Sequence, residues 1–213
     1  MQIINSFSIG IGSSYLSEGL ELGRNIFSQN RHLLVEGQTN VTSFVHQNYH
    51  KHVVKENYTN EDDVEKLKSL LLNEGINYLK EMKWYLDFYE YEVTNLWLNE
   101  YYLENHCQGM HSHPGYLVSG TYYIDVPINS NPIVFYNPTM HIIPSGMLFS
   151  ENNNPNFKFN EYNSTTWTFY PKEGEVFFWP SNLIHSVDKS EFKGTRRSIS
   201  FDINTKKFLR KIN

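Results

Sequence analysis

The chain has 213 residues, a net charge of −5 at neutral pH, and 15 tyrosines and 14 phenylalanines. This length suits one domain, and the aromatic content provides a sizeable core that favours β-strands. The acidic balance argues against nucleic acid as a partner. Because Cys107 is the single cysteine, the chain excludes an intrachain disulfide framework and a cysteine-based zinc site.

The amino-terminal residues lack a basic region followed by a long apolar run, so we expect neither a signal peptide nor a membrane-spanning segment. The single cysteine fits a reducing compartment, and we expect a cytoplasmic protein. The many Asn, Tyr, Ile and Lys residues are typical of AT-rich genomes such as those of phages, whose proteins act in the host cytoplasm. A homodimer is left open.

Residues 1–83 are expected to form a helix-containing lead-in, with short strands and one helix over residues 15–29. The polar stretch 45–58 contains three histidines, whose irregular spacing favours a solvated loop over a metal site. These histidines are His46, His50 and His52.

The clearest helix is predicted over residues 61–82. Thr59 or Asn60 can cap it, acidic residues fill its first turn, and apolar residues recur at helical spacing. This pattern predicts a helix that buttresses a sheet.

From residue 84 onward, short β-like segments follow one another, separated by turn signals. A helical front followed by many short strands indicates one α+β domain with a barrel or sandwich as its body. The predicted strands are residues 91–98, 116–126, 132–136, 165–170, 175–179 and 196–203.

The first chemical signal is the sequence His111-Ser112-His113. Residues two apart in a strand point to the same side, so both imidazoles can enter one barrel. A third histidine, His185, follows an apolar strand and a turn. Imidazole suits zinc, iron, copper and nickel, and three protein ligands leave coordination positions open. Surface or core histidines that merely form hydrogen bonds remain the alternative.

The second signal is the alternating segment that begins at Arg196, eleven residues after His185. Arg196, Ser198 and Ser200 share one face of the predicted strand. A buried arginine there requires an anionic partner, and a guanidinium binds a carboxylate in a fork geometry. An edge strand with a solvent-facing arginine is the alternative.

In this order, the motifs resemble those of the 2-oxoglutarate- and iron(II)-dependent oxygenases, in a prolyl-hydroxylase-like branch with a His-x-His-Pro sequence. The matching stretches are NLWLNEYY, HSHPGYLVSGTYYIDVP, IVFYNP, GEVFFWPSNLIHSV and RRSISFDIN, and they span about residues 95–204. The resemblance implies an α+β fold with a double-stranded β-helix core, of the jelly-roll or cupin-like kind, buttressed by amino-terminal helices. We expect a single domain over residues 1–213, with this core at 84–204.

The resemblance also implies metal ligands. His111 takes the first position and His185 the distal one, whereas His113 stands where the wider family usually has Asp or Glu. We therefore expect a three-histidine iron site, with Asp125 and Asp188 as alternative carboxylate ligands.

For the cosubstrate, the resemblance assigns Arg196 and Ser198 to the distal carboxylate of 2-oxoglutarate. Tyr123 resembles a tyrosine that reaches the same carboxylate in related hydroxylases. Tyr101 and Asn99 are further candidates, for which plain strand packing is the alternative. Arg197 is off-register and is expected to face outward.

The implied activity is oxidative decarboxylation of 2-oxoglutarate to succinate, coupled to C–H oxidation of a small molecule or a protein side chain. Two other functions remain open. One is a cupin-like three-histidine dioxygenase without 2-oxoglutarate, and the other is a non-catalytic β-helix domain for binding or assembly.

The last prediction concerns residues 138–170, a long Asn-rich stretch between two predicted strands. Loops of this length are usually functional or disordered. We expect a flap near the metal, in which residues 147–149 pair with residues 166–169.

Overall fold

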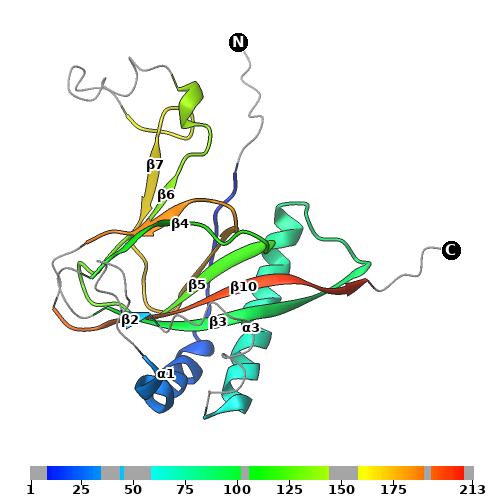
Figure 1. The fold of residues 1–213 in the computed structure, drawn as a ribbon, viewed down its shortest axis with the longest axis vertical. Helices are drawn as coiled ribbons and strands as arrows, with labels where there is room; N and C mark the ends of the chain where they lie inside the picture. The colour runs from blue at the N-terminus through cyan, green and yellow to red at the C-terminus, as the bar shows by residue number, and fades with distance from the viewer. Residues whose placement is uncertain are drawn as a thin grey trace.

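The computed structural model describes residues 9–34, 44–45, 59–101, 106–143, 158–189 and 193–208. Within these ranges, ten strands form two antiparallel sheets (Figure 1). The strands are β1 (Gly12–Tyr15), β2 (Phe44–Val45), β3 (Tyr89–Tyr101), β4 (Gln108–His111), β5 (Val118–Asp125), β6 (Ile133–Tyr136), β7 (Thr166–Phe169), β8 (Glu175–Pro180), β9 (His185–Val187) and β10 (Arg196–Phe208).

The larger sheet has six strands in the order β1-β8-β5-β10-β3-β2, and the smaller has four in the order β4-β9-β6-β7. From β3 to β10 the chain passes repeatedly between the two sheets, which is the winding of a double-stranded β-helix. The predicted fold class is therefore confirmed. The boundary at residue 84 stays a prediction, and both β1 and β2 lie before it although they belong to the six-stranded sheet.

Helix α3 (Glu61–Glu81) forms almost as predicted, because its acidic first turn suits a helix start and its buried stripe faces the sheet. Asn60 occupies the predicted N-cap position, but its side chain makes no capping hydrogen bond. The Asn60 amide donates to the Asp63 carboxylate rather than capping the backbone, and the Thr59 backbone N–H donates to the side chain of Asn30.

Helix α1 (Gly19–Asn30) begins four residues later than predicted, because Tyr15 belongs to β1. Strand β1 pairs with β8 along its whole length. This long-range pairing, which a local pattern does not contain, overrides the helical reading of that segment. Two short 3₁₀ helices, η1 (Arg31–Leu33) and η2 (Met140–Ile142), complete the described elements.

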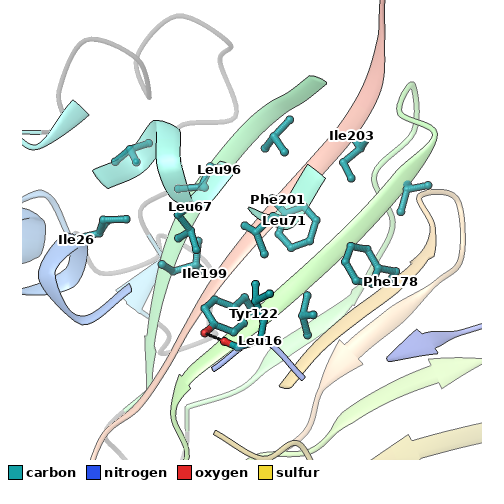
Figure 2. Packing of buried hydrophobic residues seen from close by; sticks show 14 of the residues in the cluster. Leu16, Ile26, Leu67, Leu71, Leu96, Tyr122, Phe178, Ile199, Phe201 and Ile203 are labelled. Atoms are coloured by element: carbon teal, nitrogen blue, oxygen red, sulfur yellow. Dashed lines mark hydrogen bonds between the residues drawn. The ribbon is translucent and has the colours of Figure 1, made fainter. Parts of the chain in front are cut away.

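The main hydrophobic core lies between the two α-helices and the outer face of the six-stranded sheet (Figure 2). Gly23 of α1 and Gly75 of α3 allow this close approach, since a Cβ at these positions would overlap Ile124 and Ile203, respectively. The Tyr122 hydroxyl donates a hydrogen bond to the Leu16 carbonyl and ties β5 to the segment after β1. Helices α1 and α3 thus pack against the outer face of the six-stranded sheet, and its inner face is left to the smaller sheet.

Strand β7 pairs with β6, and the two project from the body as a hairpin at the top of Figure 1. Residues 147–149, the predicted partner of 166–169, lie outside the described residues, and so do His46, His50 and His52. The pairing described for β7 is with Ile133–Tyr136, and the predicted pairing with 147–149 stays a prediction. In the part of the chain that is described, no helix is long and apolar enough to cross a membrane.

Candidate metal and cosubstrate site

Three histidines converge between the sheets. His111 ends β4, His113 follows it by two residues, and His185 opens β9. One ligating nitrogen from each ring lies within 4.8 Å of the other two. The ring centroids of His111 and His185 are 4.2 Å apart, and each lies 5.2 Å from that of His113. The structure therefore brings the three predicted ligands together, and their coordination of a metal stays a prediction.

Backbone carbonyls orient two of these rings. Nδ1 of His111 lies 2.9 Å from the Gly109 oxygen, and Nδ1 of His185 lies 3.0 Å from the Leu183 oxygen. A carbonyl only accepts, so each Nδ1 carries the proton and each Nε2 keeps a lone pair. These rings are thus preset to bind a metal through Nε2.

The third ring, that of His113, is oriented by a carboxylate. Its Nδ1 lies 2.8 Å from Oδ1 of Asp202, a residue of β10 that is only 2% exposed. Asp202 was not among the predicted site residues. The sequence pattern could have identified it, because Asp202 continues the polar stripe of Arg196, Ser198 and Ser200 at the spacing of a strand.

Burial also favours the neutral state that a metal ligand needs. Burial, with the neighbouring His111 as the next cause, lowers the pKa of His185 to about 3. Burial is likewise the largest cause that lowers the pKa of His111. Both imidazoles are therefore neutral at physiological pH, and a metal does not have to displace a proton from them.

The alternative carboxylate ligands do not reach this cluster. Asp125 lies on the outer face of the six-stranded sheet, where it pairs with Arg24 and Arg197. Asp188 accepts a hydrogen bond from the Ser186 hydroxyl and is absent from the histidine cluster. Both carboxylate assignments are wrong for this structure, because each side chain has a partner elsewhere.

Arg196 lies in the same pocket as the histidines, on the inner face of β10, and is 1% exposed. Its guanidinium stacks on Tyr101 and Tyr123, with distances of 4.7 and 5.0 Å to the ring centroids. Its Nε and Nη1 find no acceptor among the described residues. Buried polar groups are normally paired, so two vacant donors on a buried cation indicate a site for an anion.

The other predicted cosubstrate residues surround this guanidinium. In the strand register, Arg196 pairs with Tyr101, and Ser198 pairs with both Asn99 and Tyr123. All of them line the pocket. The Tyr123 hydroxyl has no acceptor within the described ranges, and burial raises the pKa of Tyr123 to about 12, so it remains a donor.

Among the described side chains that line the pocket, Arg196 is the only one with a permanent charge. Trp179 and Gln108 are among the lining residues that were not predicted. The Trp179 indole N–H is buried without an acceptor in the described part of the chain, and its ring lies 4.8 Å from that of His185. The pocket therefore offers donors and positive charge, which suits an anionic ligand at a metal.

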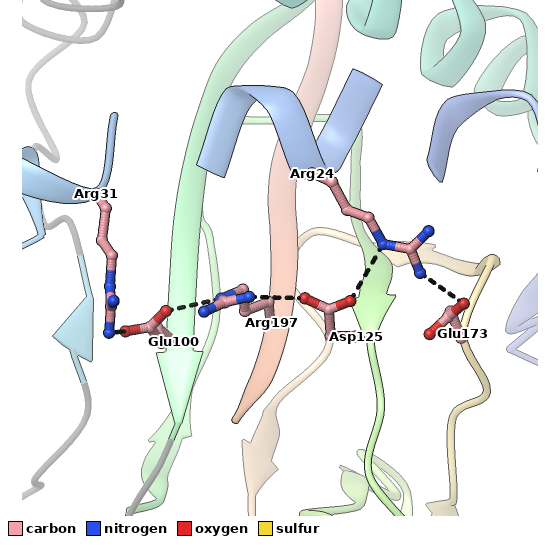
Figure 3. A network of polar contacts seen from close by, with 6 residues as sticks. All are labelled: Arg24, Arg31, Glu100, Asp125, Glu173 and Arg197. Atoms are coloured by element: carbon pink, nitrogen blue, oxygen red, sulfur yellow. Dashed lines mark hydrogen bonds and ion pairs between the residues drawn. The ribbon is translucent and has the colours of Figure 1, made fainter. Parts of the chain in front are cut away.

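Arg197 points to the opposite face, as predicted. It bonds Glu100 at 2.8 Å and Asp125 at 3.0 Å, within a chain of ion pairs that crosses the outside of the sheet (Figure 3). The neighbouring arginines 196 and 197 thus have separate tasks. One faces the pocket, and the other ties strands β3, β5 and β10 together.

The donor set fits the ligands that iron(II) accepts, because imidazole nitrogen suits iron as well as zinc, copper and nickel. The unpaired donors of Arg196 fit the distal carboxylate of 2-oxoglutarate. The site can therefore hold a metal at one end and a carboxylate at the other.

The comparisons with known proteins agree with this chemistry. A family model described as "Putative 2OG-Fe(II) oxygenase" matches residues 95–202, about half of the chain. No curated protein sequence matches.

Several solved structures share the fold. An oxidoreductase of the 2OG-Fe(II) oxygenase family from Burkholderia pseudomallei superposes with a TM-score of 0.58 at 16% identity, over 92% of this chain and 84% of its own. A prolyl-4-hydroxylase from Pseudomonas putida gives 0.58 at 9% identity, over 94% and 95%. A prolyl hydroxylase from Trichoplax adhaerens, in complex with a peptide fragment of the hypoxia inducible factor oxygen degradation domain, gives 0.57 at 11% identity, over 92% and 83%.

At these identities the structural likeness shows a common fold, and the family match carries the assignment. It spans all of β4 to β9, about half of β3 and of β10, and all three histidines together with Arg196. The chain therefore belongs to the 2-oxoglutarate- and iron(II)-dependent oxygenases.

Proposed function

We propose that this protein hydroxylates its substrate with iron(II) held by His111, His113 and His185 and with 2-oxoglutarate held by Arg196. The observation that carries the proposal is the presence, in one pocket, of three converging imidazoles and a buried arginine with vacant donors. Neither feature alone specifies this reaction, because a metal site needs no buried arginine and an anion site needs no histidine cluster.

Bound iron(II) would supply dioxygen activation, oxidative decarboxylation of 2-oxoglutarate and C–H oxidation of the substrate. The chain itself supplies position and charge. Arg196 pairs with the distal carboxylate, and Ser198 and Tyr123 add hydroxyl groups beside it. Tyr101 stacks on the guanidinium and holds its plane, while the side-chain oxygen of Asn99 in the pocket wall has no partner among the described residues.

The pocket has one buried end, from which water is excluded. Arg196, Tyr101 and Tyr123 are at most 1% exposed, whereas His111 is partly exposed. The buried end therefore suits the cosubstrate, and the side near His111 suits the entry of substrate. Low exposure also strengthens the pairing between the guanidinium and a carboxylate.

A row of aromatic side chains on the small sheet supports a proposal for the substrate class. Phe135 pairs with His185, and Trp167 pairs with Phe135, so all three lie in one row across the sheet. Trp167 is 44% exposed. This row supports an uncharged or aromatic substrate group, on a small molecule or on a protein side chain, beside the metal.

Arg196 weighs against one of the two other functions, and the three histidines weigh against the other. A three-histidine dioxygenase that needs no 2-oxoglutarate would have no use for a buried guanidinium with vacant donors. A binding domain without chemistry would not require three imidazoles with preset Nε2 atoms. The buried guanidinium and the three histidines both have a role when a metal and a dicarboxylate bind together.

An anaerobic titration tests the proposal. Iron(II) followed by 2-oxoglutarate should produce the weak visible charge-transfer band of the chelate, and succinate should form once oxygen is admitted. Iron binding without the band would favour the dioxygenase that does not use 2-oxoglutarate. Failure to bind iron(II) at all would leave the binding domain.

A further inference from the structure

The wider family usually has an Asp or Glu among the metal ligands. In this chain a carboxylate, that of Asp202, lies behind one of the three histidines instead. Asp202 contacts His113 rather than the point where the three histidines converge. The histidine therefore stands between this carboxylate and the proposed metal. Asp202 is the only carboxylate among the described residues that forms an ion pair with one of the three histidines.

The surroundings of Asp202 show that it acts as a hydrogen-bond acceptor. The Ser119 hydroxyl donates to Oδ1 at 2.6 Å, and the Asn95 amide donates to Oδ2 at 3.0 Å. A carboxylate only accepts hydrogen bonds, so the Nδ1–H of His113 is the donor in the 2.8 Å contact. Ser119 and Asn95 come from the strands on either side of β10, so the sheet itself fixes the carboxylate.

A buried anion is costly unless a positive group compensates it. In the described part of the chain, the only ion-pair partner of Asp202 is His113. Three neutral imidazoles, in turn, would leave the charge of a divalent metal without a nearby anion. A metal bound to Nε2 of His113 would compensate the negative charge of Asp202. Asp202, which accepts from Nδ1, would in turn compensate the positive charge of the metal.

We propose that Asp202 is a positioning residue of the metal site, which fixes the His113 ring and raises the affinity of Nε2 for the metal. A carboxylate behind a ligating histidine orients the ring and increases its basicity, and loss of such a partner typically lowers metal affinity about 10–100-fold. In this chain, the anionic ligand of the usual site is replaced by a His113–Asp202 pair. The inference rests on the proposed function, since it requires that the histidines bind metal.

A purely structural role for Asp202 is the competing explanation, because Asp202 also links three strands. The variant Asp202→Asn distinguishes the two roles, because it keeps an acceptor oxygen for His113 and removes the charge. Asp188→Asn is the matched control. It removes the same charge three residues from His185, from a side chain that bonds only Ser186 among the contacts described.

The experiment measures the dissociation constant for Co(II), a redox-stable probe, by competition with a chelator. Asp202→Asn should weaken binding about 10–100-fold, and Asp188→Asn should leave it within about twofold of the wild type. Thermal unfolding of the metal-free variants checks that each one folds. Equal affinity of Asp202→Asn and wild type would overturn the proposal.

A second background shows whether Asp202 acts through His113. His113→Asp restores a carboxylate ligand and removes the ring that Asp202 holds, so Asp202→Asn should then change the Co(II) affinity little. An equally large loss in that background would assign Asp202 to the fold alone. Wild-type protein that binds no divalent metal would instead disprove the proposed function, and this inference with it.

If Asp202→Asn does not fold, the wild type still provides a test. Nitrogen-15 histidine NMR of the Zn(II)-loaded protein should show His113 bound through Nε2 and protonated at Nδ1, with the Nδ1–H shifted downfield by its carboxylate acceptor. A His113 ring that binds Zn(II) through Nδ1, or does not bind it, would overturn the proposal.

Discussion

His111 and His185 are register partners across the β4–β9 pair, with their ring centroids 4.2 Å apart. Because a strand pair fixes the distance between its partners, two of the three proposed ligands are placed by backbone hydrogen bonds. Metal binding then requires little movement of these two strands.

Replacement of His185 with Ala should abolish iron binding. The change removes one of three ligands, while the main core on the far side of the six-stranded sheet is untouched. Metal analysis of protein loaded anaerobically measures the loss, and circular dichroism checks that the fold remains. Near-stoichiometric iron in this variant would contradict the three-histidine site.

The stability of the metal-free protein should depend on pH through His185. Its pKa is about 3 in the folded protein and near 6.5 when unfolded, so between these values only the unfolded chain takes up the proton. Folding stability is then fully present above about pH 6.5 and falls as the pH decreases toward 3, by about 1.4 kcal/mol per pH unit for one such group.

Urea unfolding at several pH values measures this slope, and His185→Gln should lower it. The variant removes the titrating group but retains a polar side chain of similar reach. A slope that is the same in wild type and variant would show that His185 is not buried in its neutral form.

Arg196→Ala should weaken 2-oxoglutarate binding at least about 30-fold, equivalent to the roughly 2 kcal/mol or more that loss of one partner of a buried charge pair costs. Iron binding should persist, because the three histidines do not depend on Arg196. Anaerobic titration of the chelate band gives the affinity. Arg196→Lys should recover only part of it, since an ammonium cannot reproduce the fork geometry.

Arg197→Ala should leave 2-oxoglutarate affinity unchanged and lower the free energy of unfolding by about 1–3 kcal/mol. Glu100 has a side chain only 4% exposed, and without Arg197 its remaining ion pair among the described residues is with the exposed Arg31. The adjacent pair Arg196→Ala and Arg197→Ala therefore forms a matched comparison of pocket and fold. Equal effects of both changes on affinity would contradict the strand register.

Local patterns were sufficient for much of the fold. Helix α3 and strands β5, β6, β7 and β8 lie within two residues of their predicted bounds, because an apolar stripe marks the helix and turn residues separate the strands. Parity along β10 also placed Arg196 and Arg197 on opposite faces. These features depend on neighbours in sequence, which a linear pattern contains.

The sequence by itself determined the chemical inventory of this protein: three histidines, a distal arginine, and the alternation that separates Arg196 from Arg197. Only the tertiary structure decided which groups meet. The contact between His113 and Asp202 joins residues 89 positions apart, and β1 joins β8 across most of the chain. Such contacts arise from the pairing of distant strands around a shared core, which no local pattern encodes, and they exclude Asp125 and Asp188 while bringing Asp202 to the site.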